Sequence, residues 1–209
     1  MSYRHVIGIG ASEDRLEKLI QERLKPGADK EMVDRRIWDL FGEEWCVMFT
    51  DLSGFSRGVA KFGIIHFLQT IFESERLLIP VIEDHDGILL KAEGDSLLVI
   101  FRNAIKGISC TLKMQEVLIE YNKDKIPEEQ ILLCVGLGYG PMLRIGDQDV
   151  FGAEVNAASK LGEDTAEAWE ILVTENVKNR AGDLPGIEFL KLDETPPGAT
   201  GAYRIIVKK

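Results

Sequence analysis

The sequence predicts an α+β fold in which helices pack on one face of a βαββαβ sheet, an order known as ferredoxin-like. Apolar runs of strand length alternate with amphipathic stretches of helix length from residue 44 onward. The segment 86–101 holds two apolar runs separated only by a short glycine-containing turn, which is typical of a hairpin. A helical stretch lies on each side of this hairpin, and a further strand lies beyond each helix, at 45–49 and at 131–140. Together these elements give the βαββαβ order.

Two amphipathic helices are predicted to precede the sheet. We expect residues 1–43 to form a helical extension and residues 44–209 to form the main domain. Ser12 and Asp29 are the expected N-caps of the two helices, and Gly42 the stop of the second. Apolar residues recur at helical spacing in the first helix (Leu16, Leu19, Ile20 and Leu24), and the second helix is expected to bury Val33, Ile37, Leu40 and Phe41. The pair would pack on its own domain or serve as a partner-binding arm.

The main domain is predicted to alternate strands and helices to its end. Within the helix at 57–84, Pro80 indicates a bend or a break. The remaining helices are expected at 103–121, 152–163 and 175–181. Two strands are expected within 86–101, and the others at 45–49, 131–140, 170–174, 187–192 and 202–207. The last two strands are expected to close the sheet.

The composition excludes several classes of protein. A formal net charge of −10 argues against binding to a nucleic-acid backbone, which requires clustered Lys and Arg. The three cysteines (Cys46, Cys110, Cys134) lie apart in apolar stretches, so we expect reduced core thiols. No apolar run approaches the ~20 residues that span a bilayer, and the N-terminus lacks a secretory signal pattern. A cytoplasmic protein without membrane insertion is the expectation.

Two aspartates lie where apolar strands end. Asp51 follows the strand 45–49, and Asp95 follows Gly94 in the hairpin. Paired carboxylates at strand ends suit Mg²⁺, which leaves its other positions to water and phosphate. The backbone of 52–56, with Gly54 relieving crowding, could point N–H groups at phosphate oxygens. The alternative is that Asp51 caps a helix and Asp95 shapes a turn.

The hairpin bears on how a site could be assembled. If Glu93 and Gly94 form a two-residue loop, Lys91 lies opposite Ser96 and falls on the other face from Asp95. The two side chains would then not share a site in one chain. They could share composite sites between two copies.

Three stretches together resemble the signature blocks of class III nucleotidyl cyclase catalytic domains. They are "FTDLSGFS", "HDGILLKAEGDSLLVIF" and "DVFGAEVNAASKL", in the order of that family, within a resemblance that covers roughly residues 44–207. The resemblance implies a cyclase or palm-type sheet and conversion of a nucleoside triphosphate to its 3′,5′-cyclic monophosphate and pyrophosphate. It also implies a head-to-tail homodimer with sites between the subunits, and two Mg²⁺ or Mn²⁺ ions.

The matching positions give an expected role to each site residue. Asn156 would orient the ribose, and Lys160 stands where the family usually has an arginine on the α-phosphate. The metal ligands would be Asp51, the Leu52 carbonyl and Asp95; the base-recognising pair of the other protomer would be Lys91 and Asp149; and the phosphate turn would be Ser53, Gly54, Phe55 and Ser56. The connection 140–152 is shorter than is usual in the family.

The base can be inferred from donors and acceptors. A lysine donor and a carboxylate acceptor suit the acceptor N1 and the amino group of adenine, and they disfavour guanine. Cytosine also offers an acceptor beside an amino group, so CTP stays open. The sequence therefore predicts an adenylate cyclase with ATP as its partner. Because Lys160 lacks the planar fork of arginine, a nucleotide-binding module with little turnover is the alternative.

Overall fold

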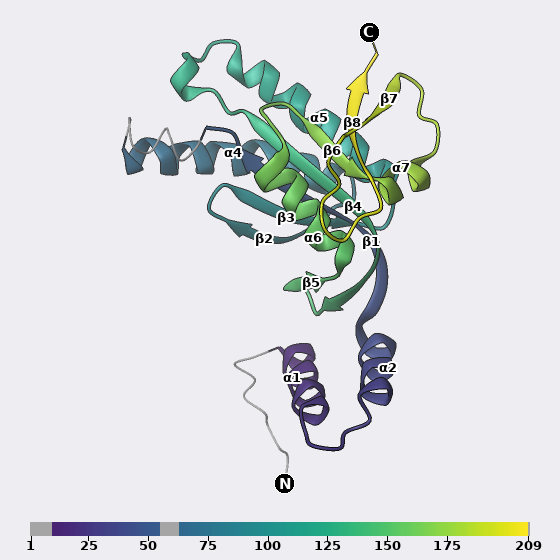
Figure 1. The fold of residues 1–209 in the computed structure, drawn as a ribbon. Helices are drawn as coiled ribbons and strands as arrows, with labels where there is room; N and C mark the ends of the chain where they lie inside the picture. The colour runs from purple at the N-terminus through teal and green to yellow at the C-terminus, as the bar shows by residue number, and fades with distance from the viewer. Residues whose placement is uncertain (1–9, 55–62, 209) are drawn as a thin grey trace.

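The computed structural model describes residues 10–54 and 63–208, and these form a mixed α+β fold around one sheet (Figure 1). Eight strands are found in this part of the chain, in the order β2-β3-β1-β4-β6-β8-β7, with β5 paired to β4 beside this path. Their bounds are β1 Gly42–Leu52, β2 Ile88–Glu93, β3 Ser96–Phe101, β4 Leu133–Ile145, β5 Asp149–Phe151, β6 Ile171–Thr174, β7 Ile187–Lys191 and β8 Ala202–Val207. The β2-β3-β1-β4 portion confirms the predicted βαββαβ unit.

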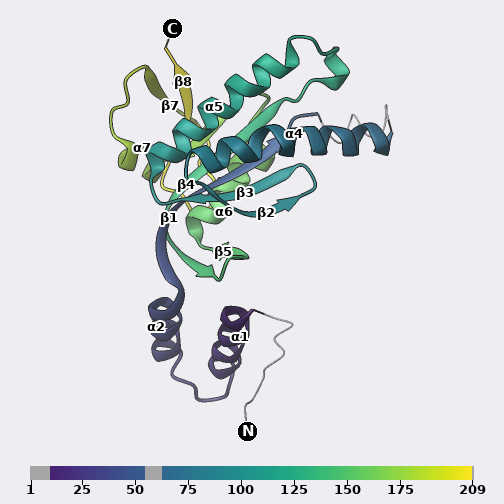
Figure 2. The same ribbon diagram turned by 180° about the vertical axis from the view of Figure 1, so that it is seen from behind.

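The helices cover both faces of the sheet. The long helices α4 (Ile64–Asp84) and α5 (Ala104–Asn122) lie together on the face seen in Figure 2, as the βαββαβ order predicts. The short helix α7 (Glu175–Ala181) contributes to the same core. The helix α6 (Ala153–Ser159) packs on the opposite face against β1 and β4. The expectation that all helices share one face is therefore wrong for α6.

The central strand β1 is buried on both sides. Cys46 and Met48 belong to the core under α4 and α5, whereas Trp45 and Val47 belong to the core under α6. Because side chains alternate along a strand, a strand covered on both faces needs an unbroken apolar run. The apolar run of β1 is explained by this position.

The N-terminal helices pack on an extension of the sheet. Helix α1 (Ala11–Arg23) and helix α2 (Lys30–Phe41) bury Leu19, Val33 and Ile37 against Ile145 at the end of β4. In Figure 1 the two helices lie below the sheet, connected to it through β1. The β4–β5 hairpin is thus covered by helices of its own chain.

The helix boundaries confirm some predictions and correct others. The Asp29 side chain caps α2 by accepting from the Met32 N–H (3.0 Å), as predicted. Ser12 is not the cap of α1; the helix starts after Gly10, whose N–H donates to Glu13 (3.0 Å). Leu40 is 54% exposed rather than buried.

Pro80 lies inside α4, which continues to residue 84 without a break. Leu78, Val81 and Ile82 are buried around it, so core packing holds this last part of the helix in place. The strand β4 also continues five residues beyond the predicted end, because its extension pairs with β5.

The three cysteines are free and buried, as predicted. Burial raises the pKa of Cys110 to about 12 and that of Cys134 to about 11. In residues 10–54 and 63–208 no helix is both long enough and apolar enough to cross a bilayer.

Candidate active site

Asp51 and Asp95 lie at adjoining ends of two paired strands. Asp51 lies near the end of β1, and Asp95 lies in the turn that leads into β3. The main-chain hydrogen bonds between β1 and β3 hold the two strands together near the aspartates. The Leu97 N–H also donates to the Thr50 hydroxyl (3.1 Å). Two carboxylates from distant parts of the sequence are thereby brought together.

The pKa values of both carboxylates are raised above that of a free aspartate. Burial and the charge of Asp95 raise the pKa of Asp51 to about 7. Burial raises the pKa of Asp95 as well, and the charge of Glu163 adds to the effect on both groups. A pair of half-buried carboxylates with raised pKa values has too little positive charge nearby to stabilise both anions. Such a pair is chemically suited to a divalent cation.

The donor set fits a cation that shares its ligands with a substrate. Over the described ranges, no group of three or more His, Cys, Asp or Glu side chains is placed to hold a metal ion. Mg²⁺ is commonly bound by one or two carboxylates together with water and substrate phosphates. Asp51, Asp95 and the main-chain carbonyl of Leu52 are the groups that could hold it here.

The hairpin turn lies one residue later than predicted, which shifts the strand pairing by two residues. Glu93 pairs with Ser96 and Lys91 with Leu98, so Gly94 and Asp95 form the turn. Two-residue hairpin turns of the favoured kinds need a positive φ at their first central position, and Gly94 supplies it (61°). Because Asp95 lies in the turn itself, the inference that strand alternation puts it on the face opposite Lys91 is wrong.

Lys91 and Asp149 form an ion pair across the α6 face of the sheet. Lys91 Nζ lies 2.6 Å from Asp149 Oδ2, and the side chains are 33% and 29% exposed. The hydrogen bond to Asp149 raises the pKa of Lys91. The other oxygen of Asp149 accepts from the Val150 N–H (2.9 Å), which fixes the carboxylate. The structure thus brings the two expected base-recognising residues together.

A pocket of about 200 Å³ adjoins this ion pair. It is lined by Phe49, Lys91, Glu93, Ser96, Leu98, Asp149 and Glu163. Sites for small molecules commonly have volumes of ~300–1,000 Å³. The pocket of a single chain is therefore small for a nucleoside triphosphate.

The turn after β1 is described as far as Gly54. Gly54 has a φ of 82°, a backbone conformation that glycine adopts more readily than other residues. The Ser53 N–H donates to the Leu132 carbonyl (2.8 Å), so the expectation that it faces a phosphate is wrong. Phe55 and Ser56, the other residues expected in this turn, lie outside the described residues.

Asn156 and Lys160 lie on α6 and its continuation, and both are exposed. Beyond Ser159 the chain continues as the π-helical segment Lys160–Thr165. Lys160 Nζ pairs with Asp164 (2.8 Å) on the surface. Among the contacts of the described residues, none joins Asn156 or Lys160 to the two aspartates or to the Lys91–Asp149 pair. These two expected site residues are not assembled with the others in one chain.

Glu163 is a site residue that the sequence did not single out. It accepts from the Ser96 hydroxyl (2.8 Å) and from the Ser159 hydroxyl, and its charge raises the pKa of Asp51. In the sequence, only the four-residue spacing of Ser159 and Glu163, which suits a contact along a helix, could have pointed to Glu163. The π-helical turn that directs Glu163 toward β3 has no recognisable pattern.

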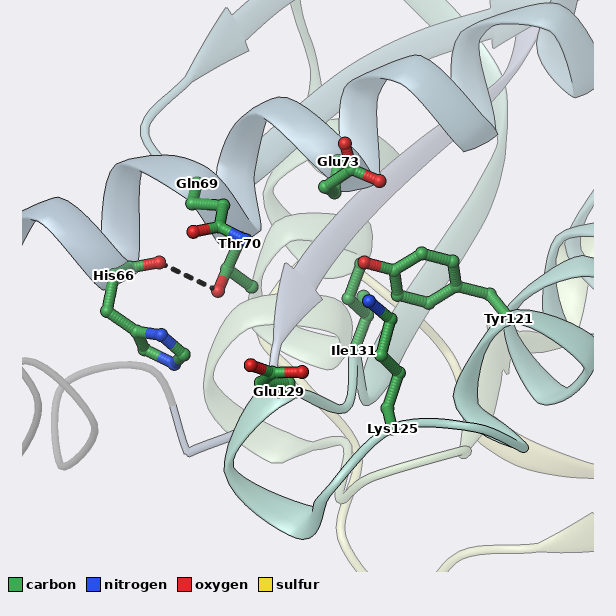
Figure 3. A pocket seen from close by; sticks show the side chains of 8 residues that line it. All are labelled: His66, Gln69, Thr70, Glu73, Tyr121, Lys125, Glu129 and Ile131. Atoms are coloured by element: carbon green, nitrogen blue, oxygen red, sulfur yellow. Dashed lines mark hydrogen bonds between the residues drawn. The ribbon is translucent and has the colours of Figure 1, made fainter.

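A second small pocket lies between α4 and the segment that joins α5 to β4 (Figure 3). His66, Thr70, Tyr121 and Lys125 are among its lining residues, and the Thr70 hydroxyl donates to the His66 carbonyl (3.1 Å). Its volume of about 10 Å³ has room for about one water molecule. It is therefore too small to be a ligand site.

Known proteins similar to this chain include two bacterial relatives. Serine/threonine-protein kinase pkn2 of Myxococcus xanthus is 31% identical over 138 residues, which are 65% of this chain and 16% of the kinase. Putative adenylate cyclase 3 of Rhizobium meliloti is 24% identical over 144 residues, which are 69% of this chain and 24% of that protein. The chain thus spans only a small part of the length of either relative.

Solved structures of similar fold include two cyclase domains. An adenylate/guanylate cyclase/hydrolase from Silicibacter pomeroyi has a TM-score of 0.68 and 22% identity, covering 79% of this chain and 97% of that one. A non-canonical dimeric guanylyl cyclase domain of a fusion protein from Blastocladiella emersonii has a TM-score of 0.65 and 18% identity, covering 81% of this chain and 98% of that one. A sequence model of the adenylate and guanylate cyclase catalytic domain matches residues 42–196. The chain therefore belongs to the adenylate and guanylate cyclase catalytic domain family.

Proposed function

We propose that the protein is an adenylate cyclase that converts ATP to 3′,5′-cyclic AMP and pyrophosphate between two copies of the chain. The observation that carries the proposal is the pair of half-buried carboxylates, Asp51 and Asp95, in a chain of the cyclase family. A chain with a net charge of −10 needs cations in order to hold a triphosphate. The carboxylate pair is where such cations would bind.

Two Mg²⁺ or Mn²⁺ ions are the proposed cofactors, held by Asp51, Asp95 and the Leu52 carbonyl. When bound, they would neutralise phosphate charge and make the ribose 3′-hydroxyl more acidic. The remaining tasks fall to the chain's own groups. Asn156 orients the ribose for in-line attack on the α-phosphorus, and Lys160 Nζ donates to the α-phosphate oxygen as charge develops there.

The Lys91–Asp149 pair is the proposed reader of the base. Lys91 Nζ would donate to N1 of adenine, and the Asp149 carboxylate would accept from the amino group. Without nucleotide the two side chains satisfy each other at 2.6 Å, so a base that offers both an acceptor and a donor replaces that contact without leaving either charge unpaired. Guanine presents the reverse pattern. Cytosine keeps the required pattern, so CTP is the alternative substrate.

A second copy of the chain is proposed to complete each site. The pocket beside Lys91 and Asp149 has a volume of about 200 Å³ in one chain. Asn156 and Lys160 are exposed and contact neither pair, so they are available to a partner. A head-to-tail homodimer would place Asp51 and Asp95 of one copy against Lys91, Asp149, Asn156 and Lys160 of the other.

The activity test is incubation of the purified protein with each of the four common nucleoside triphosphates and Mn²⁺, followed by chromatography of the products. Cyclic AMP in excess is the expected result. More cyclic CMP than cyclic AMP would overturn the base assignment. Nucleotide binding without any cyclic product would instead favour a nucleotide-binding module, the alternative motivated by Lys160.

The organisation of the chain follows the same proposal. Residues 44–209 would be the catalytic domain and residues 1–43 a helical extension that covers the β4–β5 hairpin. A cytoplasmic location, where ATP is available, is the corresponding proposal for the protein in the cell.

A further inference from the structure

Glu154 is a buried carboxylate that the proposed chemistry does not use. It is only 5% exposed, although it lies in the first turn of α6. Its Oε2 accepts from the Tyr139 N–H (3.0 Å) and the Thr174 hydroxyl (2.6 Å), and its Oε1 accepts from Asn176 Nδ2 (2.7 Å). These three donors belong to β4, to the end of β6 and to α7. One side chain thus connects α6 to three other elements.

Simple packing does not explain a glutamate at this position. Burying a carboxylate costs several kcal/mol unless hydrogen bonds replace its lost water. An apolar side chain would fill the same space without that cost, but it would take the acceptor away from the Tyr139 N–H and the Thr174 hydroxyl. Three directed hydrogen bonds, however, fix the place and the rotation of a helix more narrowly than apolar contacts do.

The glycines of β4 show how closely α6 approaches the sheet. A Cβ on Gly138 would lie 2.4 Å from the Glu154 carbonyl oxygen, and a Cβ on Gly136 would lie 2.1 Å from that of Ala158. The main chain of α6 therefore lies directly on the main chain of β4. The alternating glycines in this strand, which form no dinucleotide-binding motif, are explained by this contact.

We propose that Glu154 is a positioning residue that fixes α6, and with it Asn156 and Lys160, against β4. The helix α6 has only seven residues, and an isolated helix of that length is not stable in water. Its position therefore depends on tertiary contacts, and within the described part of the chain the Glu154 hydrogen bonds supply direction among them. The consequence for activity rests on the proposed function, in which Asn156 and Lys160 contact the ribose and the α-phosphate.

The kinetic test compares Glu154→Gln with Glu154→Leu. Glutamine keeps one strong acceptor, and Asn176 can turn its amide to match the other end, so kcat should stay within about fivefold of wild type. Leucine removes every acceptor, and a shift of ~1 Å in α6 should lower kcat about 100-fold. KM should change less than about threefold, because the base and the metal-bound phosphates contact residues outside α6. Equal losses in both variants, or a rise in KM alone, would overturn the proposal.

Mixing variants assigns the defect to one half of the composite site. Glu154→Leu protein mixed with Asp51→Ala protein should recover activity, because a mixed dimer has one site with Asp51 from one chain and an intact α6 from the other. Glu154→Leu mixed with Asn156→Ala should recover none, since both changes damage the same half. Recovery in both mixtures, or in neither, would contradict the assignment.

A milder variant keeps the proposal testable if Glu154→Leu does not fold. Asn176→Ala removes one donor from the surface side of the cluster, and kcat should fall about three- to tenfold with KM unchanged. An unchanged kcat in this folded variant would overturn the proposal.

Hydrogen exchange separates failure of this inference from failure of the proposed function. In Glu154→Leu, or in Asn176→Ala if the former does not fold, amides of residues 153–165 should exchange at least about tenfold faster, with β1 and β3 unchanged. Uniform acceleration across the sheet would overturn local positioning. If the wild type makes no cyclic nucleotide but this local effect is seen, the function fails while the structural role of Glu154 stands.

Discussion

Asp51, a ligand of the proposed metal site, has a protonation behaviour that lowers the stability of the metal-free fold. Its pKa is raised to about 7, whereas an aspartate in an unfolded chain titrates near 4. Between those values the folded chain holds more protons than the unfolded chain, so the free energy of unfolding falls as pH rises from ~4 to ~7. Without metal, this carboxylate therefore opposes folding at pH 8.

We predict that Asp51→Asn stabilises the metal-free protein while it removes activity. The gain at pH 8 in EDTA should be about 1–2 kcal/mol after allowance for solvent screening. That corresponds to ~2–8 °C in Tm for a chain of this size, and it should largely vanish at pH 4. Mn²⁺ should raise the Tm of the wild type and leave that of the variant unchanged. Asp183→Asn, at an exposed position, is the control; a lower Tm for Asp51→Asn than for wild type at pH 8 would contradict the prediction.

Lys160 gives the second prediction for a single residue. Its surface pair with Asp164 is a contact worth only ~0.3–0.5 kcal/mol, so the ammonium is free to reach a phosphate of a partner-bound nucleotide. Lys160→Met should lower kcat about 100- to 1,000-fold, and Lys160→Arg should raise kcat up to about tenfold by restoring a bidentate fork. Steady-state kinetics check both. Lys113→Met on α5 is the matched control, and a kcat for Lys160→Met within twofold of wild type would exclude the assigned role.

At the scale of elements, local sequence patterns predicted most helices and strands, but they did not predict the hairpin register or the face of the sheet on which α6 packs. The apolar run of β1 and the helical periods of α4 and α5 follow from burial, so their place in the sequence was predictable. The hairpin register was missed because one positive φ at Gly94 decides it, and the flanking apolar runs fit either register. Neither the position of α6 on the opposite face nor the π-helical segment that contains Glu163 leaves a periodic signal in the sequence. The Lys91–Asp149 contact, 58 residues apart in sequence, was predicted from the family resemblance and not from a local pattern.

The contact between α6 and β4 gives a prediction at this scale. Gly138→Ala places a methyl group 2.4 Å from a main-chain oxygen, which cannot move unless α6 moves. We expect a loss of about 1–3 kcal/mol in the free energy of unfolding, and a loss of kcat in the same range as that of Glu154→Leu. Urea denaturation and kinetics measure the two effects. Gly201→Ala, whose new methyl group would meet side-chain atoms no closer than 3.5 Å, is the control and should change neither.

At the scale of the whole molecule, the residues of the proposed site fall into groups that one chain does not bring together. Asp51 and Asp95 interact directly, Lys91 and Asp149 interact directly, and the exposed Asn156 and Lys160 contact neither pair. A nucleotide that needs all of these groups would have to find some of them on another copy. Twofold symmetry then requires two equivalent sites in each dimer.

Mixing two inactive variants tests whether the sites are shared. Asp51→Ala and Asn156→Ala damage different halves, so a mixed dimer has one intact site and one site with both changes. With random exchange, half of the dimers are mixed, and activity should return to about a quarter of the wild-type value. Asp51→Ala mixed with Asp95→Ala is the control and should stay inactive, because both changes fall in the same half. If subunit exchange is verified and the first mixture also stays inactive, each site is built within one chain, and the pocket beside Lys91 must then open to admit the nucleotide.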